Sequence, residues 1–559
     1  MPTPSANTIY LTPMNDTFTM GAGNFAVDGM DGTDVITMGA GNSSVSTGKG
    51  NSVITMGAGD SIVAAGAGNN IIVAGAGNSH VSVGDGNSII TIGAGNSTIG
   101  AGNGGNIITA GAGDSDISVG NGNNIILTGA GNSRIAALLG DNMITAGAGD
   151  NHVFLLGGDN LVITGAGNSS VSAGNGSNHI ITGAGDSTIY TGNGNNVILT
   201  GSGNSTIDTL AGDNMITAGA GNNHVHAKDG NNSVTTGPGN SSVDVGNGNS
   251  TIFTGAGDSD VSAGNGSNHI TTGAGVNSIS VGNGNNVIMT GIGNSTITTL
   301  VGDNLITLGD GINSVHAAGG NNTITTGAGN ATITTGAGND HIVTGMGDDV
   351  INAGGGSNTV DAGGGSDVLV YVAADHAQST VQGVDVFDGG AGVDTLRLEL
   401  TGAEWANASV QTDVVNYLAF VAANTDSSGQ ANDATFTFST LGLTAKGIET
   451  LALVVDGVAI DPVNDASAPV HRVYEGGGSN TFWFKAEASN TTISHFKVDG
   501  INADGIVLQR IAGMTNFAEA MAATTQEGAN AVMHLAANES ITLVGVNMAH
   551  LTAGDFMFM

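Results

Sequence analysis

The sequence has no cysteine, only six prolines, and only nine lysines and arginines in 559 residues. Without cysteine there is no disulfide framework and no cysteine-ligated zinc or iron–sulfur site. With so little proline, and with glycine not recurring at every third residue, the chain is not collagen. No apolar run approaches the roughly 18 residues of a membrane-spanning helix, so we expect no membrane insertion.

Positive charge is also missing from most of the chain. Only Lys49, Arg134 and Lys228 precede residue 372, and the formal net charge is −37. Such a surface repels phosphate backbones, so we expect no nucleic-acid partner. It attracts divalent cations instead. The first residues, MPTPSANTIYLTPMNDTF, have neither a basic start nor an apolar segment, so the sequence predicts no classical signal peptide.

What the sequence has in abundance is glycine, 96 residues, arranged with a nine-residue period. Units begin at residues 21, 30, 39 and every ninth residue through 363, and a degenerate unit at 12–20 keeps the register. Residues 12–371 therefore hold 40 units without an insertion. The seventh position is Ile or Val in every unit from Val27 to Val360, and the third position is almost always glycine.

Each unit predicts one short strand and one turn. Positions 6 to 8 form the strand with position 7 pointing inward, and the glycines supply the turn. One unit cannot bury a single Ile, but stacked units bury a continuous column. We therefore expect an all-β chain: a long parallel β-solenoid of about 20 coils, each made of two nonapeptides, followed by a β-rich C-terminal region. Near-identical units 90 residues apart, GNGSNHIIT at 174–182 and GNGSNHITT at 264–272, favour a structural role.

Two stretches carry a family resemblance: DDVINAGGGSNTVDAGGGSDVLVY at 348–371 and FDGGAGVDTLRL at 387–398. They resemble the RTX (repeats-in-toxin) nonapeptide, Gly-Gly-x-Gly-x-Asp-x-(Leu/Ile)-x. The resemblance implies a right-handed parallel β-roll that is secreted by type I machinery and binds Ca²⁺ outside the cell. In that family the motif carboxylates and turn backbone carbonyls hold calcium, which prefers such oxygen ligands.

Carried over to this chain, the motif aspartate falls at position 5 of the unit. The calcium-binding residues implied are Asp34, Asp340, Asp349, Asp367, Asp385 and Asp394, with the backbone carbonyls of Gly345, Gly347, Gly363 and Gly365; Asp16 also occupies the motif position. Because Asp349, Asp367 and Asp385 are each 18 residues apart, we expect them to stack along one edge as a calcium ladder.

Between Ser43 and Ala331 the fifth position is almost always Asn or Ser, so this stretch lacks the motif carboxylates. Asn can form hydrogen-bonded ladders with Asn in the next coil, and we expect the central roll to need less calcium. Aspartates at the fourth position, such as Asp60, Asp114 and Asp258, leave two interpretations open: outward solvating charges or supplementary ligands. His224 and His226 are either exposed polar residues or a pair that shares a transition metal.

Composition divides the chain into five segments. Residues 1–20 form the lead and the degenerate repeat, 21–371 the β-roll, 372–460 a β-rich region with a residual calcium-binding repeat, 461–469 a linker, and 470–559 a C-terminal β cap and secretion-signal region. The end, ESITLVGVNMAHLTAGDFMFM, resembles the C-terminal regions of RTX proteins exported by type I secretion. A β-domain that caps the open edge of the roll is the alternative, and both can hold.

No H-E-x-x-H motif or Gly-x-Ser-x-Gly elbow is present, so we expect no enzyme.

The chain resembles RTX-type surface-layer proteins, which implies a secreted, cell-surface structural protein that assembles with copies of itself into a filament or surface layer. The alternative is a monomeric adhesin with Trp405 and Tyr417 as sugar-stacking or core residues. A remote alternative is ice binding, disfavoured because Ala or Asn mostly stands between the turn glycines.

Overall fold

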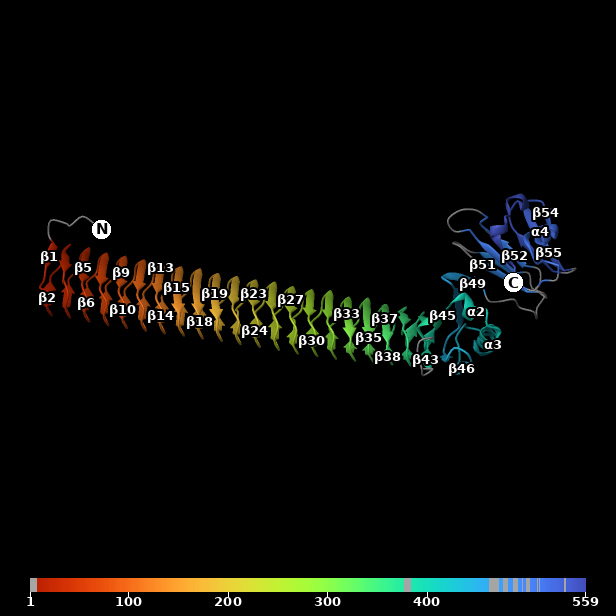
Figure 1. Ribbon diagram of the computed structural model, residues 1–559, viewed down its shortest axis with the longest axis horizontal. Coiled ribbons are helices and arrows are strands. Elements are labelled where there is room, and N and C mark those ends of the chain that lie inside the picture. Colours follow the sequence, from red (N-terminus) through yellow and green to blue (C-terminus); the bar gives the residue numbers. More distant parts are fainter. Residues whose placement is uncertain are drawn as a thin grey trace. The chain divides into compact units, whose positions relative to one another are not determined.

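The computed structural model describes residues 8–376, 384–461, 472–475, 481–485, 491–494, 496–498, 503–509, 511, 513–536 and 539–558 (Figure 1). The chain divides into two compact units, Met1–Gly309 and Asp310–Met559, and each unit is described by itself.

The first unit is a stack of parallel strands in two sheets. Figure 1 shows the odd-numbered strands in one row and the even-numbered strands in the other. The odd-numbered strands are β1 (Thr8–Tyr10), β3 (Ala26–Asp28), β5 (Ser43–Thr47), β7 (Ser61–Ala65), β9 (Ser79–Val83), β11 (Ser97–Ala101), β13 (Ser115–Val119), β15 (Ser133–Leu139), β17 (Asn151–Gly157), β19 (Ser169–Asn175), β21 (Ser187–Thr191), β23 (Ser205–Thr209), β25 (Asn223–Ala227), β27 (Ser241–Val245), β29 (Ser259–Ala263), β31 (Asn277–Val281) and β33 (Ser295–Val301).

The even-numbered strands are β2 (Thr17–Met20), β4 (Val35–Met38), β6 (Val53–Met56), β8 (Ile71–Ala74), β10 (Ile89–Ile92), β12 (Ile107–Ala110), β14 (Ile125–Thr128), β16 (Met143–Ala146), β18 (Leu161–Thr164), β20 (His179–Ile181), β22 (Val197–Leu199), β24 (Met215–Ala218), β26 (Ser233–Thr236), β28 (Thr251–Phe253), β30 (His269–Thr272), β32 (Val287–Thr290) and β34 (Leu305–Thr307).

Each strand pairs in parallel with the strand 18 residues away. Ile90, for example, pairs with Ile72 on one side and Ile108 on the other, and all three side chains are fully buried. The seventh position of each unit therefore forms the column of β-branched residues that the periodicity predicts, and the predicted parallel β-solenoid is confirmed.

The turns need glycine at the third position because neighbouring coils approach closely there. Gly122 has a φ of +135°, and a Cβ on it would lie 2.3 Å from the carbonyl oxygen of Gly104. Only glycine adopts this backbone without strain or a clash. From Asp34 onward, the regular turns place the fifth-position side chains in the interior beside the turn carbonyls.

The second unit begins with the same coils. Its elements up to residue 461 are β35 (Asn313–Gly319), β36 (Thr323–Thr325), β37 (Ala331–Ala337), β38 (His341–Val343), β39 (Val350–Asn352), β40 (Thr359–Asp361), β41 (Gly364–Gly365), β42 (Val368–Val372), α1 (Ala373–His376), β43 (Asp385–Asp388), β44 (Ala391–Gly392), β45 (Thr395–Leu400), α2 (Gly402–Trp405), α3 (Ala408–Asn424), β46 (Thr435–Phe438), β47 (Leu443–Lys446), β48 (Thr450–Val455) and β49 (Val458–Asp461).

The helices α2 and α3 were not predicted from the sequence, which indicated only strands in residues 372–460. Asn407 caps α3, its side chain accepting a hydrogen bond from the Ser409 amide. Val410, Val414 and Tyr417 recur at helical spacing and are buried. This spacing is the signal that the sequence offered and that a strand-based interpretation missed.

The remaining elements form a second core within the same unit. They are β50 (Arg472–Glu475), β51 (Thr481–Lys485), β52 (Thr491–Ser494), β53 (Gly505–Gln509), α4 (Phe517–Ala522), β54 (Thr524–Glu527), β55 (Asn530–Ala536), β56 (Glu539–Leu543), the 3₁₀ turns Met548–His550 and Ala553–Asp555, and β57 (Phe556–Phe558). Phe556 belongs to this core. The predicted linker lies outside the described residues except for Asp461.

Candidate metal site

The fifth-position carboxylates of the second unit form a buried column that runs from coil to coil. One carboxylate oxygen, Oδ1, of each aspartate accepts a hydrogen bond from the fifth-position amide of the preceding coil. Ala331 donates to Asp349 at 2.6 Å, Asp349 to Asp367 at 2.8 Å, and Asp367 to Asp394 at 2.8 Å. The Asp394 amide then donates to Glu449 Oε2 at 2.6 Å, which ends the column.

A second column lies on the other row of turns. The Asn322 amide donates to Asp340 Oδ1 at 2.7 Å, the Asp340 amide to Asn358 at 2.9 Å, and the Asn358 amide to Asp385 at 2.8 Å. The predicted site residues are thus divided between two columns: Asp349, Asp367 and Asp394 in one, and Asp340 and Asp385 in the other.

The prediction that Asp349, Asp367 and Asp385 stack along one edge is therefore wrong. Asp394 takes the place expected for Asp385, and it lies 27 residues after Asp367 instead of 18. The coil is longer because the segment between β42 and β43, which contains α1, is inserted there. Counted in steps of nine residues, Asp385 and Asp394 still fall at the fifth position. The backbone of this segment, however, does not form another coil of the roll.

The other oxygen of these carboxylates, Oδ2, is buried without a hydrogen bond from any described residue in Asp349, Asp367 and Asp394. Burial raises the pKa of Asp367 to about 7, and the nearby Asp394 and Asp349 carboxylates add to the increase. Burial likewise raises the pKa of Asp394 to about 6. Such uncompensated buried carboxylates are costly unless a proton or a cation accompanies them.

Asp34 and Asp385 are also buried carboxylates with a raised pKa, but their surroundings differ. Asp34, in the first unit, is fully buried, its Oδ2 accepts no hydrogen bond from the described residues, and burial raises its pKa. Burial raises the pKa of Asp385 to about 7. Its Oδ2 lies 3.3 Å from Nε2 of His376, whose ring stacks on Tyr371. His376 was not among the predicted site residues, because α1 was not foreseen.

The units that carry Asn show what the turn offers to its fifth-position side chain. Nδ2 of Asn70 donates to the carbonyl oxygens of Gly66 at 3.0 Å and Gly68 at 3.1 Å, the first and third residues of its own unit. In the aspartate units the corresponding carbonyls belong to Gly345, Gly347, Gly363 and Gly365. A carboxylate has no proton to donate to them.

The aspartate turns thus gather carbonyl and carboxylate oxygens, and their fifth-position side chain brings no proton donor of its own. Among these carbonyls, that of Gly345 accepts from the Gly364 amide at 2.9 Å and that of Gly363 from the Ala391 amide at 2.8 Å. An all-oxygen set of this kind fits Ca²⁺, and the buried Oδ2 atoms are the direct mark of the fit. Asp349 with Gly345 and Gly347, and Asp367 with Gly363 and Gly365, are the residues that would hold it. Within the described residues there is no group of three or more His, Asp or Glu side chains placed to bind a metal by themselves, so backbone carbonyls are needed.

In the first unit the predicted amide ladder is confirmed. From Asn106 to Asn214, each fifth-position Asn of the even-numbered row donates from Nδ2 to Oδ1 of the Asn 18 residues later, at 2.9 to 3.1 Å. Nδ2 of Asn124, for instance, also donates to the Gly122 carbonyl at 2.8 Å. The amide group therefore supplies the positive partner that an aspartate turn lacks.

The fourth-position side chains form a separate, exposed ladder. Oδ1 of Asn42 accepts from the Asp60 amide at 2.8 Å, and Oδ1 of Asp60 accepts from the Asn78 amide at 2.9 Å. A fourth-position aspartate such as Asp60 thus accepts a hydrogen bond from the backbone of the next coil, a structural role that neither sequence interpretation included. The role of these aspartates as supplementary ligands stays a prediction.

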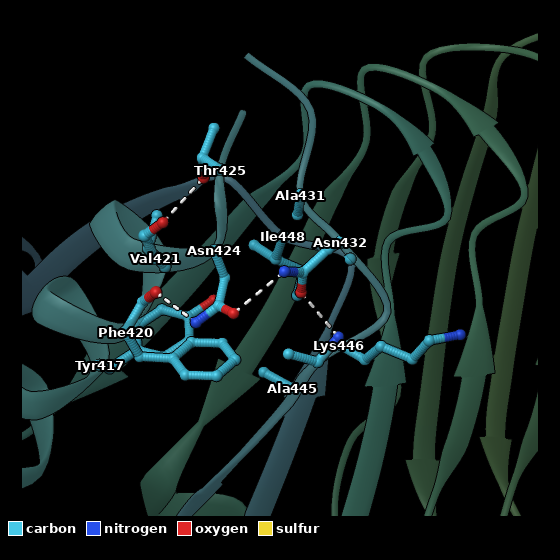
Figure 2. Close-up of a pocket in the computed structure, with 12 residues that line it drawn as sticks. Tyr417, Phe420, Val421, Asn424, Thr425, Ala431, Asn432, Ala445, Lys446 and Ile448 are labelled. Atoms are coloured by element: carbon cyan, nitrogen blue, oxygen red, sulfur yellow. Dashed lines mark hydrogen bonds between the residues drawn. The ribbon is translucent and has the colours of Figure 1, made fainter. Parts of the chain in front are cut away.

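Other candidate residues have different surroundings. Nδ1 of His226 lies 2.9 Å from Asp244 Oδ2, which gives that imidazole a carboxylate partner in place of His224. Tyr417 is 1% exposed and lines a cavity of about 10 Å³, room for about one water (Figure 2). It cannot stack on a sugar. Trp405 instead lines a separate cavity of about 360 Å³ in the second unit.

No helix in the described part of the chain is long and apolar enough to span a membrane.

Comparison with known proteins supports the assignment of the repeats. The family model of the RTX calcium-binding nonapeptide repeat matches residues 64–135, 137–369 and 382–397 in overlapping segments. No curated protein matches the chain. A crystal structure of the extracellular lipase LipA from Serratia marcescens is similar at 14% sequence identity with a TM-score of 0.15. The match covers 45% of this chain and 40% of the lipase chain.

Proposed function

Since this chain belongs to the family of RTX calcium-binding nonapeptide repeat proteins, we propose that it is a secreted structural protein that assembles, in the presence of Ca²⁺, into an extracellular filament or surface layer. Its partners are further copies of itself, and type I machinery exports it through the C-terminal segment. Ca²⁺ supplies positive charge to the aspartate turns.

The observation that carries this proposal is the contrast between the two sets of turns. In the even-numbered row of the first unit, from Asn106 to Asn214, Asn side chains donate to turn carbonyls and to each other without an ion. In the second unit, Asp349, Asp367 and Asp394 place buried carboxylates at the same fifth position. Their Oδ1 atoms accept backbone hydrogen bonds, but their Oδ2 atoms have no donor among the described residues. A roll that needs no ion along its amide ladder, and needs calcium at its aspartate turns, suits a permanent scaffold. Its folding or assembly would begin where calcium is plentiful.

The net charge supports the calcium requirement of assembly. At −37, copies of this chain repel one another over distances of about a Debye length, 8 Å at physiological salt. Divalent cations bound to the acidic turns reduce that repulsion. We therefore expect association to depend on Ca²⁺ more strongly than on the same ionic strength of Na⁺.

Electron microscopy of the purified full chain in a calcium series tests the proposal, with chelator and Mg²⁺ as controls. Ordered filaments or sheets that form with Ca²⁺ and dissolve with chelator are expected. Isolated particles at every calcium concentration would contradict the assembly while leaving calcium binding untouched. Isothermal titration of the same sample with Ca²⁺ separates the two outcomes.

A second candidate function, glycan binding by an adhesin, is favoured by the cavity of about 360 Å³. Both tryptophans of the chain, Trp405 and Trp483, line it, with ring centroids 6.0 Å apart and planes at 90°. Gln411, Asp456 and Gln509 add polar groups. Aromatic walls with a few polar groups are typical of small-ligand sites.

A glycan array with the full chain tests this second function. Binding that is lost in Trp483→Ala but kept in Tyr190→Ala, an exposed aromatic residue of the first unit, would establish it. Equal loss or equal retention in both variants would reject the cavity as the site.

A further inference from the structure

The two sheets of the first unit present different outer faces. In each strand the sixth and eighth positions point outward, and the seventh points into the core. On the odd-numbered strands these outward positions are mostly Ser, Thr, His and Ala, and they include the charged residues Asp28, Asp116, Arg134, Asp208, Asp244 and Asp260.

On the even-numbered strands from β4 to β34, no outward position is Asp, Glu, Lys or Arg. The eighth position is Thr or a larger apolar residue in every one of these strands. Most sixth positions are also apolar: Val35, Val53, Ile71, Ile89, Ile107, Ile125, Met143, Leu161, Val197, Met215, Val287 and Leu305. We call this surface the uncharged face.

Most of the apolar side chains at the sixth positions of the uncharged face are exposed to solvent, and the others, such as Val53 and Leu161, are half-buried. Ile89 is 42% exposed, Ile107 41% and Met143 42%. The strands that carry them are hydrogen-bonded to one another without a break, from β8 through β16. A sheet surface on which exposed apolar side chains recur in successive strands, with Thr between them and no charge, marks an interaction site.

We infer that the uncharged face is the surface through which a second copy of this chain docks, sheet against sheet. The inference rests on the self-assembly proposed above and names its interface. Three arguments select a second copy as the occupant: charge, spacing and area.

The argument from charge is that the chain carries a net charge of −37, so most of its surface repels another copy. The uncharged face is the part of the first unit's sheet surface where two copies can touch without bringing carboxylates together. Acidic turns, with residues such as Asp141 and Asp159, border it, and there Ca²⁺ reduces the repulsion between the rims.

The argument from spacing is that outward side chains of paired strands repeat at about 4.8 Å. Two rows interdigitate along their whole length only when they share this repeat, as in the dry interfaces between paired sheets. An identical face has the same repeat by construction, whereas a partner with another surface geometry meets it at scattered points.

The argument from area compares the face with known interfaces. The run from β4 to β34 is about 72 Å long at about 4.8 Å per strand, and a strand of four residues is about 13 Å wide, which gives about 900 Å². A stable protein–protein interface buries about 800 Å² on each partner. The uncharged face is thus large enough to hold two copies together.

The test compares two double variants of the full chain by sedimentation in a calcium series. Ile89→Lys with Ile107→Lys places charges on the uncharged face. His80→Lys with Thr98→Lys places the same charges on outward positions of β9 and β11, on the other sheet. Both variants change the net charge equally. Circular dichroism in the presence of Ca²⁺ confirms that each folds.

We expect the Ile89/Ile107 variant to need at least tenfold more protein for half-assembly than the wild type, and the control to stay within twofold. Assembly of both variants like the wild type would overturn this interface and leave the proposed function standing. A wild type that stays monomeric at every calcium concentration would overturn both.

A second measurement avoids charge altogether. Because the chain has no cysteine, Ile107→Cys and Thr98→Cys each accept one environment-sensitive fluorophore. We expect a blue shift on assembly at position 107 and none at position 98. The reverse pattern, or no shift at either position, would overturn the inference.

Discussion

The backbone amide of Asp367 donates a 2.8 Å hydrogen bond to the carboxylate of Asp394, a residue 27 positions later. The two preceding steps of this column, from Ala331 to Asp349 and from Asp349 to Asp367, each span 18 positions. Because of this longer step, the column of carboxylates stays continuous across the inserted segment. The column then ends at Glu449. Both oxygens of Glu449 accept hydrogen bonds, from the amides of Asp394 and Ala431 at 2.6 Å each, so the column ends without an orphan oxygen.

Replacing Asp367 by Asn should make its turn independent of calcium. The new amide can donate to the carbonyls of Gly363 and Gly365, as Asn70 does in the first unit. We expect Asp367→Asn to weaken calcium binding at this turn by about tenfold or more and to raise the melting temperature in chelator. Titration calorimetry and thermal melts measure the two effects.

The control for this variant is Asp348→Asn. Asp348 is exposed and accepts a hydrogen bond from the Ser366 amide, a role that Asn fills equally well. The Asp348→Asn variant removes the same charge. An equal effect of both variants would contradict the assignment of the fifth-position carboxylate as the specific ligand, and would point to net charge or to Asp348 as a supplementary ligand.

The opposite exchange, Asn124→Asp, should create a calcium requirement in the first unit. It removes the hydrogen bonds that Nδ2 donates to Gly122 and Asn142 and leaves a buried carboxylate. We expect a loss of about 1–3 kcal/mol in the free energy of unfolding in chelator, recovered in part by Ca²⁺. Denaturant unfolding in both conditions gives the values.

Asn123→Asp is the matched control, since Asn123 occupies the exposed fourth position where Asp occurs naturally. Its Oδ1 accepts from the Asp141 amide, which Asp can also do. We expect a change below about 0.5 kcal/mol. If Asn124→Asp proved equally neutral in chelator, the amide ladder would not stabilise the roll.

The second unit should lose stability in chelator as pH rises. The pKa of Asp367 is about 7 and that of Asp394 about 6 in the folded chain, above the ordinary value of 3.8. The folded state therefore binds more protons than the unfolded state between about pH 4 and 7, and its stability falls as pH rises through that window. Thermal melts from about pH 4.5 to 8 measure the slope.

Protons and calcium compete for the same carboxylates, so calcium affinity should rise with pH over this window. Asp367→Asn should flatten both slopes. A wild-type affinity that does not change between about pH 5.5 and 8 would contradict the assignment of these carboxylates as ligands.

The third-position glycines should be intolerant of any side chain. Gly122→Ala forces Ala to a φ of +135° and places its Cβ 2.3 Å from the Gly104 carbonyl oxygen. We expect a loss of about 1–3 kcal/mol or more. Gly100→Ala is the control, because a Cβ at Gly100 would have no atom within 4 Å and the φ there is not positive. Equal melting temperatures for the two variants would contradict this account of the turn.

The repeats could be predicted from the sequence because each unit repeats one local rule. Ile or Val at the seventh position has to be buried, and glycine at the third position allows the turn, so the coil follows from the period alone. The amide ladder of the Asn-rich units followed from the same register. A regular stack leaves few alternatives once its period is known.

Two predictions were wrong, the position of Asp385 and the absence of helices, and both concern segments where the nine-residue repeat no longer corresponds to regular coils. Asp385 kept the spacing of 18 residues in the sequence, but the insertion that contains α1 moved it to the other column and brought Asp394 to Asp367. The helix Ala408–Asn424 was missed because its apolar spacing lies between strand-like segments. Neither error could be corrected by counting residues.

The sequence by itself determined the solenoid, its core column and the residue types available to calcium, because these depend on a local period that every unit shares. Only the tertiary structure decided which carboxylates stand together, which of their oxygens lack a donor, and that one sheet of the first unit is free of charge on its outer face. These properties depend on which coils are neighbours and on which sheet each unit belongs to. The insertion that contains α1 changes the neighbours, and successive units alternate between the two sheets, although the nine-residue repeat stays the same.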